Sequence, residues 1–329
     1  MVISRFLRLA AHVQLLPVLE SGEETLVGGQ AVMEGVMMRA PHSYCVAVRK
    51  ADGTFVTEES PLEKVSDKYP MFRYPILRGI GTLGQAMWLG VKALKFSANA
   101  SLEEENAKRE PDSKPLEISS WVMGLNLLFS FAFFVFLYKF VPLLLTQLIQ
   151  TRFPAVHNQI LFNLVDGVIR ITIFLGFLYI ISRWKDIRRV FEYHGAEHKV
   201  VFNFESGKVV TVENAQKFVT WHPRCGTSFL LVVMILSMLV YMLLPFEGFV
   251  AKFLARLALL PVITGLSYEL IRYAAKHRGG LMAALTTPGL WLQRITTQPP
   301  ADDQTEVAIV ALEGAMELER KQGGQLVIA

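Results

Sequence analysis

Histidine, glutamate and cysteine residues gather in two short segments in the middle of this 329-residue chain. The first segment reads Tyr-His-Gly-Ala-Glu-His-Lys from position 193 to 199. On a helix, His194 and His198 would lie one turn apart on the same face, with Glu197 beside that face. The His-x-x-Glu-His spacing is that of inverted zinc-peptidase motifs, in which two imidazoles bind the metal and a carboxylate activates water. We therefore take His194 and His198 as candidate metal ligands and Glu197 as the candidate catalytic base.

A second segment of ligand-type side chains follows, in which His222 and Cys225 flank a Pro-Arg dipeptide. This short separation is typical of a metal-binding turn, and Pro223 and Gly226 can shape it. All four candidate ligands would make a closed tetrahedral zinc site, whereas three of them and a water would make a catalytic one. Two histidines at helical spacing can also be ordinary interfacial residues. We therefore treat the binding of a divalent ion, with zinc preferred by these ligand types, as a hypothesis that stands beside this simpler explanation.

The composition indicates a membrane protein. The chain is 52% hydrophobic and 19% charged, with a mean hydropathy of +0.36, whereas globular domains are near 45–50% apolar and about 25% charged. These values exclude a disordered chain and a collagen-like fibre, and two cysteines cannot make a disulfide framework. The net charge of +4 comes with no aromatic-interleaved basic stripe, so we expect no nucleic-acid partner.

Four apolar segments are near the twenty residues that a membrane-spanning helix needs. They cover residues 118–138, with an apolar continuation past Lys139 to position 148, and residues 160–182, 228–246 and 249–273. The last segment is weaker because Lys252, Arg256 and Glu269 interrupt it. In lipid the backbone must satisfy its own hydrogen bonds, so we expect helices rather than strands.

Basic residues set the expected orientation of these helices. The connection between the second and third apolar segments holds eight of them: Arg183, Lys185, Arg188, Arg189, Lys199, Lys208, Lys217 and Arg224. The connections on the other side offer only Arg152 and Lys252. The positive-inside rule then places this segment and both termini in the cytoplasm. We expect a multi-pass protein of the cytoplasmic (inner) membrane, with the lipid bilayer as its first partner.

The predicted fold class is a mainly α, polytopic membrane protein with about four transmembrane helices and a small cytosolic α+β part. Its predicted parts are an amphipathic N-terminal lead-in (1–25), a cytosolic β-rich element with an interfacial helix and a linker (26–117), transmembrane helices 1 and 2 (118–182), a cytosolic metal-site loop (183–227), transmembrane helices 3 and 4 (228–273), and a cytosolic C-terminal segment (274–329). In the last part, apolar residues among acidic ones from 306 to 318 predict an amphipathic helix. This helix would pack on the cytosolic domain or on another copy of the protein in a homo-oligomer.

The segment after the lead-in has β-type signals. Asp52-Gly53 stands between two β-prone runs and predicts a hairpin. The glycine-rich stretch 28–35 lacks the Lys-Ser/Thr ending of a phosphate loop. It is either an ordinary β-turn or a close backbone approach that projects Glu34 and Arg39 toward a site.

Two further stretches of this part are predicted from their length and polarity. Residues 79–91 are uncharged but too few to span a bilayer, which favours an interfacial or re-entrant helix. Residues 101–115 are polar and are expected to form a solvated linker.

Charged residues also fall inside the apolar segments, where a carboxylate is a functional-site hypothesis by default. Glu269 is an additional candidate, either as a metal ligand or as a partner of Arg272. Asp166 and Arg170 stand four residues apart and are expected to pair with each other.

The chain resembles the YqhQ-like family of bacterial membrane proteins of unknown function. The resemblance is carried by the strings at residues 28–39, 194–199 and 222–229, and by the tail Pro-Gly-Leu-Trp-Leu-Gln at 288–293 with its continuation to 309. It covers about residues 25–315. It implies a membrane protein that is usually described as a predicted metal-dependent enzyme, with no established substrate.

Three hypotheses follow for the function. The first is a metal-dependent, peptidase-like hydrolase at the cytosolic membrane face, in which Glu197 takes a proton from water that attacks a membrane-associated peptide or ester. The second is a non-catalytic scaffold or assembly factor, in which all four ligands form a structural metal clip. The third is a transporter component, with the intramembrane charges along its pathway.

Overall fold

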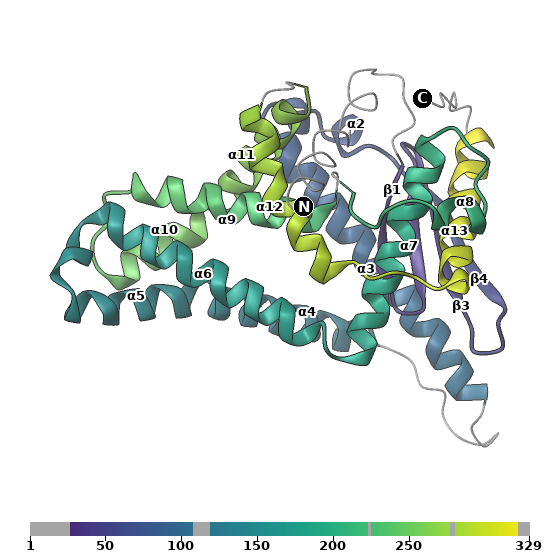
Figure 1. Cartoon of the computed structure of the whole chain (residues 1–329), viewed down its shortest axis with the longest axis horizontal. Helices are drawn as coiled ribbons and strands as arrows, with labels where there is room; N and C mark the ends of the chain where they lie inside the picture. The colour runs from purple at the N-terminus through teal and green to yellow at the C-terminus, as the bar shows by residue number, and fades with distance from the viewer. Residues whose placement is uncertain (1–26, 108–118, 223–224, 277–279, 322–329) are drawn as a thin grey trace, which may run out of the picture.

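Figure 1 shows the computed structural model of the chain, which describes residues 27–107, 119–222, 225–276 and 280–321. The lead-in predicted for residues 1–25 lies outside the described residues. The chain is mainly helical with one small antiparallel sheet, as predicted. The sheet and its covering helices form one end of the molecule, and the most apolar helices extend away from it.

The sheet is a four-stranded antiparallel meander in the order β1-β2-β3-β4. Its strands are β1 (Gly28–Val32), β2 (Gly35–Arg39), β3 (Ser43–Arg49) and β4 (Phe55–Pro61). The predicted hairpin is confirmed, because β3 and β4 pair across the Asp-Gly turn and Gly53 adopts a φ of 86°. The glycine-rich stretch that precedes it is itself a hairpin, in which Val32 pairs with Gly35.

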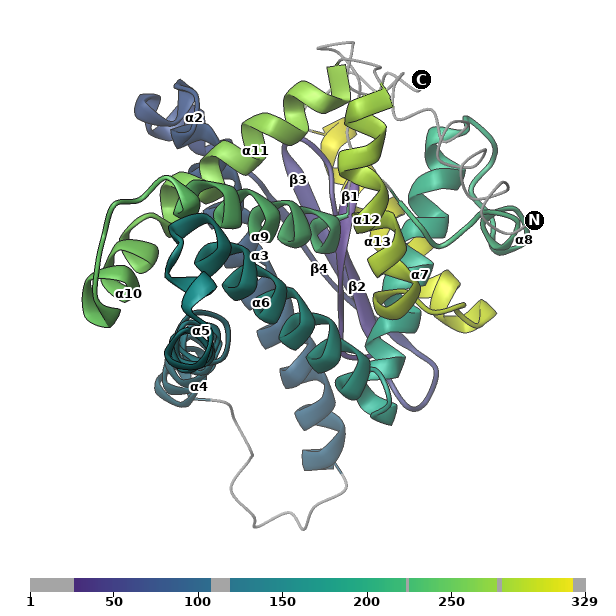
Figure 2. The ribbon, with the colours of Figure 1, turned by 60° about the vertical axis from the view of Figure 1, so that its left-hand side comes forward.

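Helices cover both faces of the sheet (Figure 2). On one face, Cys45 and Ala47 of β3 share a hydrophobic core with α7 (Lys185–Glu205) and α13 (Asp302–Lys321). On the other face, Val46 and its neighbours pack with α3 (Leu77–Ala107). This alternation follows from the two-residue period of a strand that is buried on both sides. The predicted C-terminal amphipathic helix is thus confirmed as α13, and it packs on this chain's own sheet.

Helix α3 includes one predicted helix and extends into a stretch that was predicted as a linker. Residues 79–91 belong to a 31-residue helix, and Leu89 and Ala93 are buried in the core beneath the sheet. The polar stretch from 101 is not a linker up to Ala107, because the helix continues to that residue. Its Leu, Glu and Ala residues are strong helix formers, so polarity alone did not indicate a loop. The rest of the predicted linker, residues 108–115, lies outside the described residues.

The apolar helices begin with one long rod and its antiparallel neighbour. Helix α4 (Ser120–Val135) passes through the π-helical turn η2 (Phe136–Phe140) into α5 (Val141–Arg152), and after the short turn η3 (Pro154–His157) the chain returns as α6 (Gln159–Ile181). Trp121–Arg152 and α6 are both long and apolar enough to cross a membrane. Many of their large apolar side chains are exposed, as illustrated by Phe129, which is 71% exposed.

The third and fourth predicted spans look different from the first two. Helix α9 (Gly226–Met242) ends before Pro245 and is 17 residues long, shorter than the predicted 228–246 segment. Helices α10 (Phe249–Ala258) and α11 (Leu260–Lys276) form a pair bent by 48°. Within the described residues, two helices are therefore long enough to span a bilayer, or three if the bent pair is one broken span. The chain is completed by α2 (Val65–Lys68), η1 (Pro70–Arg73), α8 (Val212–Gln216) and α12 (Gly280–Thr296).

Candidate metal centre

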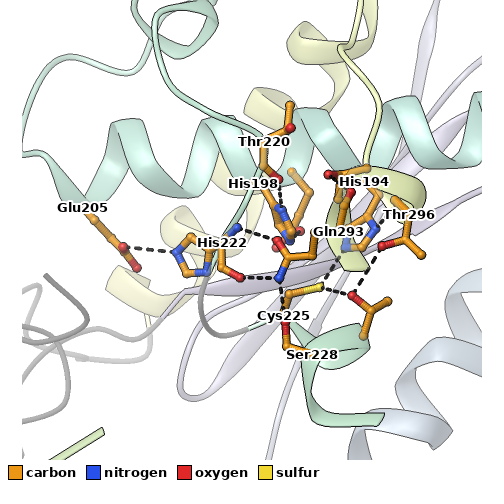
Figure 3. A network of polar contacts seen from close by, with 12 residues as sticks. His194, His198, Glu205, Thr220, His222, Cys225, Ser228, Gln293 and Thr296 are labelled. Atoms are coloured by element: carbon orange, nitrogen blue, oxygen red, sulfur yellow. Dashed lines mark hydrogen bonds and ion pairs between the residues drawn. The ribbon is translucent and has the colours of Figure 1, made fainter. Parts of the chain in front are cut away.

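Three of the predicted ligands meet where the sheet end of the molecule joins the apolar helices (Figure 3). His194 and His198 lie one turn apart on α7, with ring centroids 4.5 Å apart. Cys225 is the N-cap residue of α9, and its Sγ lies 3.2 Å from Nε2 of His194. One ligand atom from each residue lies within 4.8 Å of the other two. The structure therefore brings together three of the four predicted ligands.

Backbone carbonyl groups orient both imidazoles. Nδ1 of His194 lies 2.8 Å from the carbonyl oxygen of Thr296, and Nδ1 of His198 bonds the carbonyl oxygen of Thr220. A carbonyl can only accept, so Nδ1 of each ring carries the hydrogen. Nε2 of each ring is therefore the nitrogen left for another partner, and an imidazole that donates through Nδ1 and binds through Nε2 is the arrangement that metal-ligating histidines show.

The three side chains form a strongly coupled electrostatic group. Burial raises the pKa of the Cys225 thiol, but the adjacent His194 and His198 rings outweigh burial and hold this pKa well below its usual value. Burial also lowers the pKa of His194, yet the Cys225 sulfur, Glu197 and the Thr296 carbonyl together raise it to about 9. The group therefore favours a thiolate next to a cationic partner. A divalent ion bound by Cys225 and His194 can take the place of the proton on the His194 ring and supply the same positive charge.

Glu197 lies beside this group and is held by the sheet. Its side chain is buried, and Oε2 lies 3.3 Å from Nε2 of His198, the nitrogen that is not bonded to a carbonyl. Strand β1 passes so close that a Cβ atom on Gly29 would lie 2.7 Å from Cγ of Glu197. A glycine at this position thus lets the strand support the carboxylate from behind.

A second glycine lets the chain cross α7 at the site. The segment after α12 runs over the helix, where the Gln298 amide donates to the carbonyl of Phe191 over 2.9 Å. A Cβ atom on Gly195 would lie 2.0 Å from the Gln298 carbonyl oxygen. Only glycine permits this approach, and the crossing is what brings the Thr296 carbonyl to His194.

His222, the fourth predicted ligand, stands apart from the other three. Its Nε2 lies 3.4 Å from Oε2 of Glu205, and it does not belong to the group of mutually close ligand atoms. The backbone of His222 is fixed by Gln293 of α12, which accepts from its amide and donates to its carbonyl, each over 2.7 Å. Burial and the neighbouring His198 lower the pKa of His222 to about 3, so this ring is neutral.

The three additional candidates lie elsewhere. Glu34, in the turn between β1 and β2, pairs with Arg189 of α7. Arg39 ends β2, and burial lowers its pKa. Glu269 pairs with Arg78 of α3 and accepts from the Ile76 amide over 3.3 Å. Within the described residues, neither Glu34 nor Glu269 belongs to the group of close ligand atoms, and Glu269 pairs with Arg78 rather than with Arg272.

Sequence reasoning missed the residues that support the site. Thr220 and Thr296 act through backbone carbonyls, which leave no side-chain signature. Gln293 also donates to Oγ of Ser228 over 2.8 Å, and thus ties α12 to the first turn of α9. The signal nearest to these contacts was the family-like tail at 288–297, but its partners are distant in sequence and could not be inferred.

An apolar groove of about 430 Å³ lies on the apolar helices. It is formed by α6, α9 and α12 and lined by Ile171, Leu175, Leu231, Ile235, Thr287, Pro288, Trp291 and Leu292. Helices α9 and α12 are the same two that carry Cys225 and Thr296. The groove therefore shares its walls with the elements that build the metal centre.

Comparison with known proteins identifies relatives but not an activity. The chain matches the family described as Protein of unknown function (DUF1385) over residues 74–318. It is 37% identical to the Uncharacterized protein YqhQ of Bacillus subtilis (strain 168) over 303 residues, which cover 89% of this chain and 92% of that relative. No solved structure matches the chain. The resemblance to a YqhQ-like family is thereby confirmed.

Proposed function

Because this chain belongs to the DUF1385 family of proteins of unknown function, its function has to be argued from its own geometry, and we propose a membrane-embedded, metal-dependent hydrolase. The observation that carries the proposal is the three-residue group of His194, His198 and Cys225, with Glu197 beside it. Two imidazoles and one thiolate are donors that zinc prefers, and three protein ligands are the usual number in a catalytic zinc site.

The donor set supports a catalytic site over a closed clip. A clip would need His222 as the fourth ligand, but its Nε2 faces Glu205 instead. A zinc ion bound to three protein ligands supplies a position for water and lowers the pKa of that water toward about 7. The scaffold hypothesis therefore has less support from this geometry than the hydrolase hypothesis.

Glu197 is the proposed general base. Its Oε2 lies 3.3 Å from Nε2 of His198, the nitrogen that would bind a metal, so the carboxylate would stand beside a water held there. The carboxylate accepts a proton from the attacking water and passes it to the leaving group of an amide or ester. The Thr220 and Thr296 carbonyls keep the two imidazoles in one orientation throughout.

The apolar helices support a location in the cytoplasmic membrane. Trp121–Arg152 and α6 each fit a bilayer, and the number of crossings would be even if the bent pair α10–α11 and the shorter α9 also span it. With the basic α7 segment on the cytoplasmic side, both termini would be cytoplasmic as well. The apolar groove beside α9 and α12 favours a substrate with an apolar portion, such as a membrane-associated peptide or ester.

A second candidate function uses the same residues without a metal. Cys225 caps an apolar helix and its sulfur contacts His194, which is the pairing of a cysteine nucleophile with its base. In that case the attacking atom is Sγ, and Glu197 is not required for the first step. Zinc content and the response to substitution of Glu197 separate the two candidates.

We predict that the full chain, purified in detergent with zinc, binds one zinc per chain and hydrolyses at least one ester in a panel of chromogenic acyl esters. Glu197→Gln should keep the zinc and reduce turnover by at least 10²-fold, because a positioned general base contributes about 10²–10⁴. Elemental analysis and the rate of dye release measure the two quantities.

Two matched variants complete this test. His194→Gln should lose both zinc and turnover, whereas Glu34→Gln, which alters an acidic residue outside the group, should lose neither. Unchanged turnover in Glu197→Gln would remove the proposed base. Turnover that persists without zinc but disappears in Cys225→Ser would establish the cysteine mechanism instead.

A further inference from the structure

A second buried polar cluster lies in the apolar helices, far from the sheet. It contains Lys139 of η2, Arg170 of α6, Arg256 of α10 and the carboxylate of Asp166. All four side chains are at most 5% exposed. They surround Tyr241 in the last turn of α9, at the opposite end of that helix from Cys225.

The carboxylate is fully used by the two arginines. One oxygen of Asp166 lies 2.6 Å from Nη1 of Arg256, and the other bonds Nη2 of Arg170. One further nitrogen of each arginine has a neutral acceptor: Nη2 of Arg256 donates to Asn163 over 2.8 Å, and Nη1 of Arg170 donates to Ser237 over 2.7 Å. Both oxygens of Asp166 are thus bound to guanidinium groups.

Lys139 is held only by aromatic and hydroxyl groups in the part of the chain that the structure describes. Its Nζ donates to the Tyr241 hydroxyl over 3.0 Å and lies 5.3 Å from the centre of the ring. The ring faces of tyrosine attract cations, and the centres of both guanidinium groups are also within 5.2 Å of this ring. The ring of Tyr241 therefore lies next to three basic side chains.

The cluster has more positive charge than it can neutralise. Three basic side chains face one carboxylate, and a fourth, Lys252, lies nearby over the ring of Phe162. Nε of Arg170 is buried and has no hydrogen-bond partner. Buried charges are normally paired, because removing an ion from water is costly. An excess of basic groups over carboxylates and an unused guanidinium donor are what an anionic ligand would satisfy.

The π-helical turn η2 strengthens this interpretation. Such turns are uncommon and frequently occur at functional sites, because they redirect side chains within a helix. Here the turn interrupts the long rod Trp121–Arg152 at the one residue, Lys139, that brings a charge into its interior.

We propose that Lys139, Arg170 and Arg256 form a binding site for a phosphate group, which a phospholipid headgroup or free inorganic phosphate can supply. Arginine forks match the oxygen geometry of phosphate, and the phosphate charge of one to two offsets the excess of the cluster. The site requires neither the metal centre nor its chemistry, and therefore goes beyond the proposed function.

The test is the thermal stability of the full chain in a non-ionic detergent free of anionic lipid. One arm adds sodium phosphate against sodium gluconate at equal ionic strength, and the other adds phosphatidylglycerol against phosphatidylcholine. At about ten times its Kd, the ligand should raise the Tm by roughly 3–5 °C. A shift in the first arm identifies free phosphate as sufficient, and a shift only in the second identifies the lipid headgroup.

Two variants show whether the cluster is responsible. Lys139→Gln should lose at least half of the shift, whereas Lys217→Gln, which removes an exposed lysine on the segment after α8, should keep all of it. The proposal is overturned if neither anion raises the Tm of the unmodified chain. It is also overturned if the anion raises the Tm of Lys139→Gln and of Lys217→Gln by the same amount. If Lys139→Gln does not fold, Lys139→Arg replaces it and should keep the shift. Native mass spectrometry of the unmodified chain must then also show a bound phosphate or phosphatidylglycerol.

Discussion

The two ends of helix α9 carry buried polar clusters of opposite character. At its N-terminal end, Cys225 meets two imidazoles whose free nitrogens are electron-pair donors. At its C-terminal end, roughly 24 Å along the axis by the rise of an α-helix, Tyr241 lies among three cations and one carboxylate. The first cluster offers lone pairs and suits a metal cation, whereas the second offers hydrogen-bond donors and suits an anion. The difference shows that burial alone does not define a site; the balance of donors and charge does.

The largest expected effect comes from removing the single carboxylate of the cationic cluster. Asp166→Asn should cost about 3–5 kcal/mol of stability, because it leaves buried cations without their counter-ion. Denaturation in detergent, or failure of the variant to accumulate in membranes, measures this loss. Asp186→Asn, an exposed residue in the first turn of α7, is the matched control and should change stability by about 0.3–1 kcal/mol. A loss below that of the control would mean that the cluster is not charged as described.

An intermediate effect is expected where the sheet supports the other cluster. Gly29→Ala should cost about 1–3 kcal/mol, because its Cβ would meet Glu197, the Met37 carbonyl and the sulfur of Met38. Turnover should fall with it, since Glu197 must move, while the zinc content stays at one per chain. Gly28→Ala is the control, because nothing lies within 4 Å of a Cβ added there. Equal melting temperatures for the two variants would show that β1 does not support Glu197.

The smallest effect is expected outside both clusters. Glu34→Gln removes a half-exposed pair with Arg189, and such pairs contribute about 0.2–1 kcal/mol. Chemical denaturation should detect a loss in this range, with no change in zinc content. A loss of zinc in this variant would show that Glu34, in the turn between β1 and β2, contributes to metal binding, and would contradict a metal centre limited to its three ligands.

The sequence predicted what depends on local spacing. His194 and His198 fall on one face because a helix repeats every turn, and the Asp52-Gly53 hairpin follows from turn chemistry. The apolar rods were visible from hydropathy, although α9 proved shorter than its apolar segment because Leu243 and Pro245 belong to a loop.

What could not be predicted depends on contacts between distant segments. The backbone of His222 is hydrogen-bonded to the Gln293 side chain, which stands 71 residues away in sequence. The imidazole of His222 lies beside Glu205. Glu269 finds Arg78 at a separation of 191 residues, although Arg272 is the nearer candidate along the chain. Asp166 and Arg170 do pair, as their spacing predicted, but the pair belongs to a larger cluster that Arg256 and Lys139 complete.

X-ray absorption at the zinc edge counts the nitrogen, sulfur and oxygen ligands of the proposed centre. For the zinc-loaded chain, the account predicts two imidazole nitrogens, one sulfur near 2.3 Å and a further oxygen ligand, with an unchanged spectrum in His222→Gln. Three imidazoles with one sulfur, or a spectrum that changes in His222→Gln, would contradict it, because the open position beside Glu197 would then be closed.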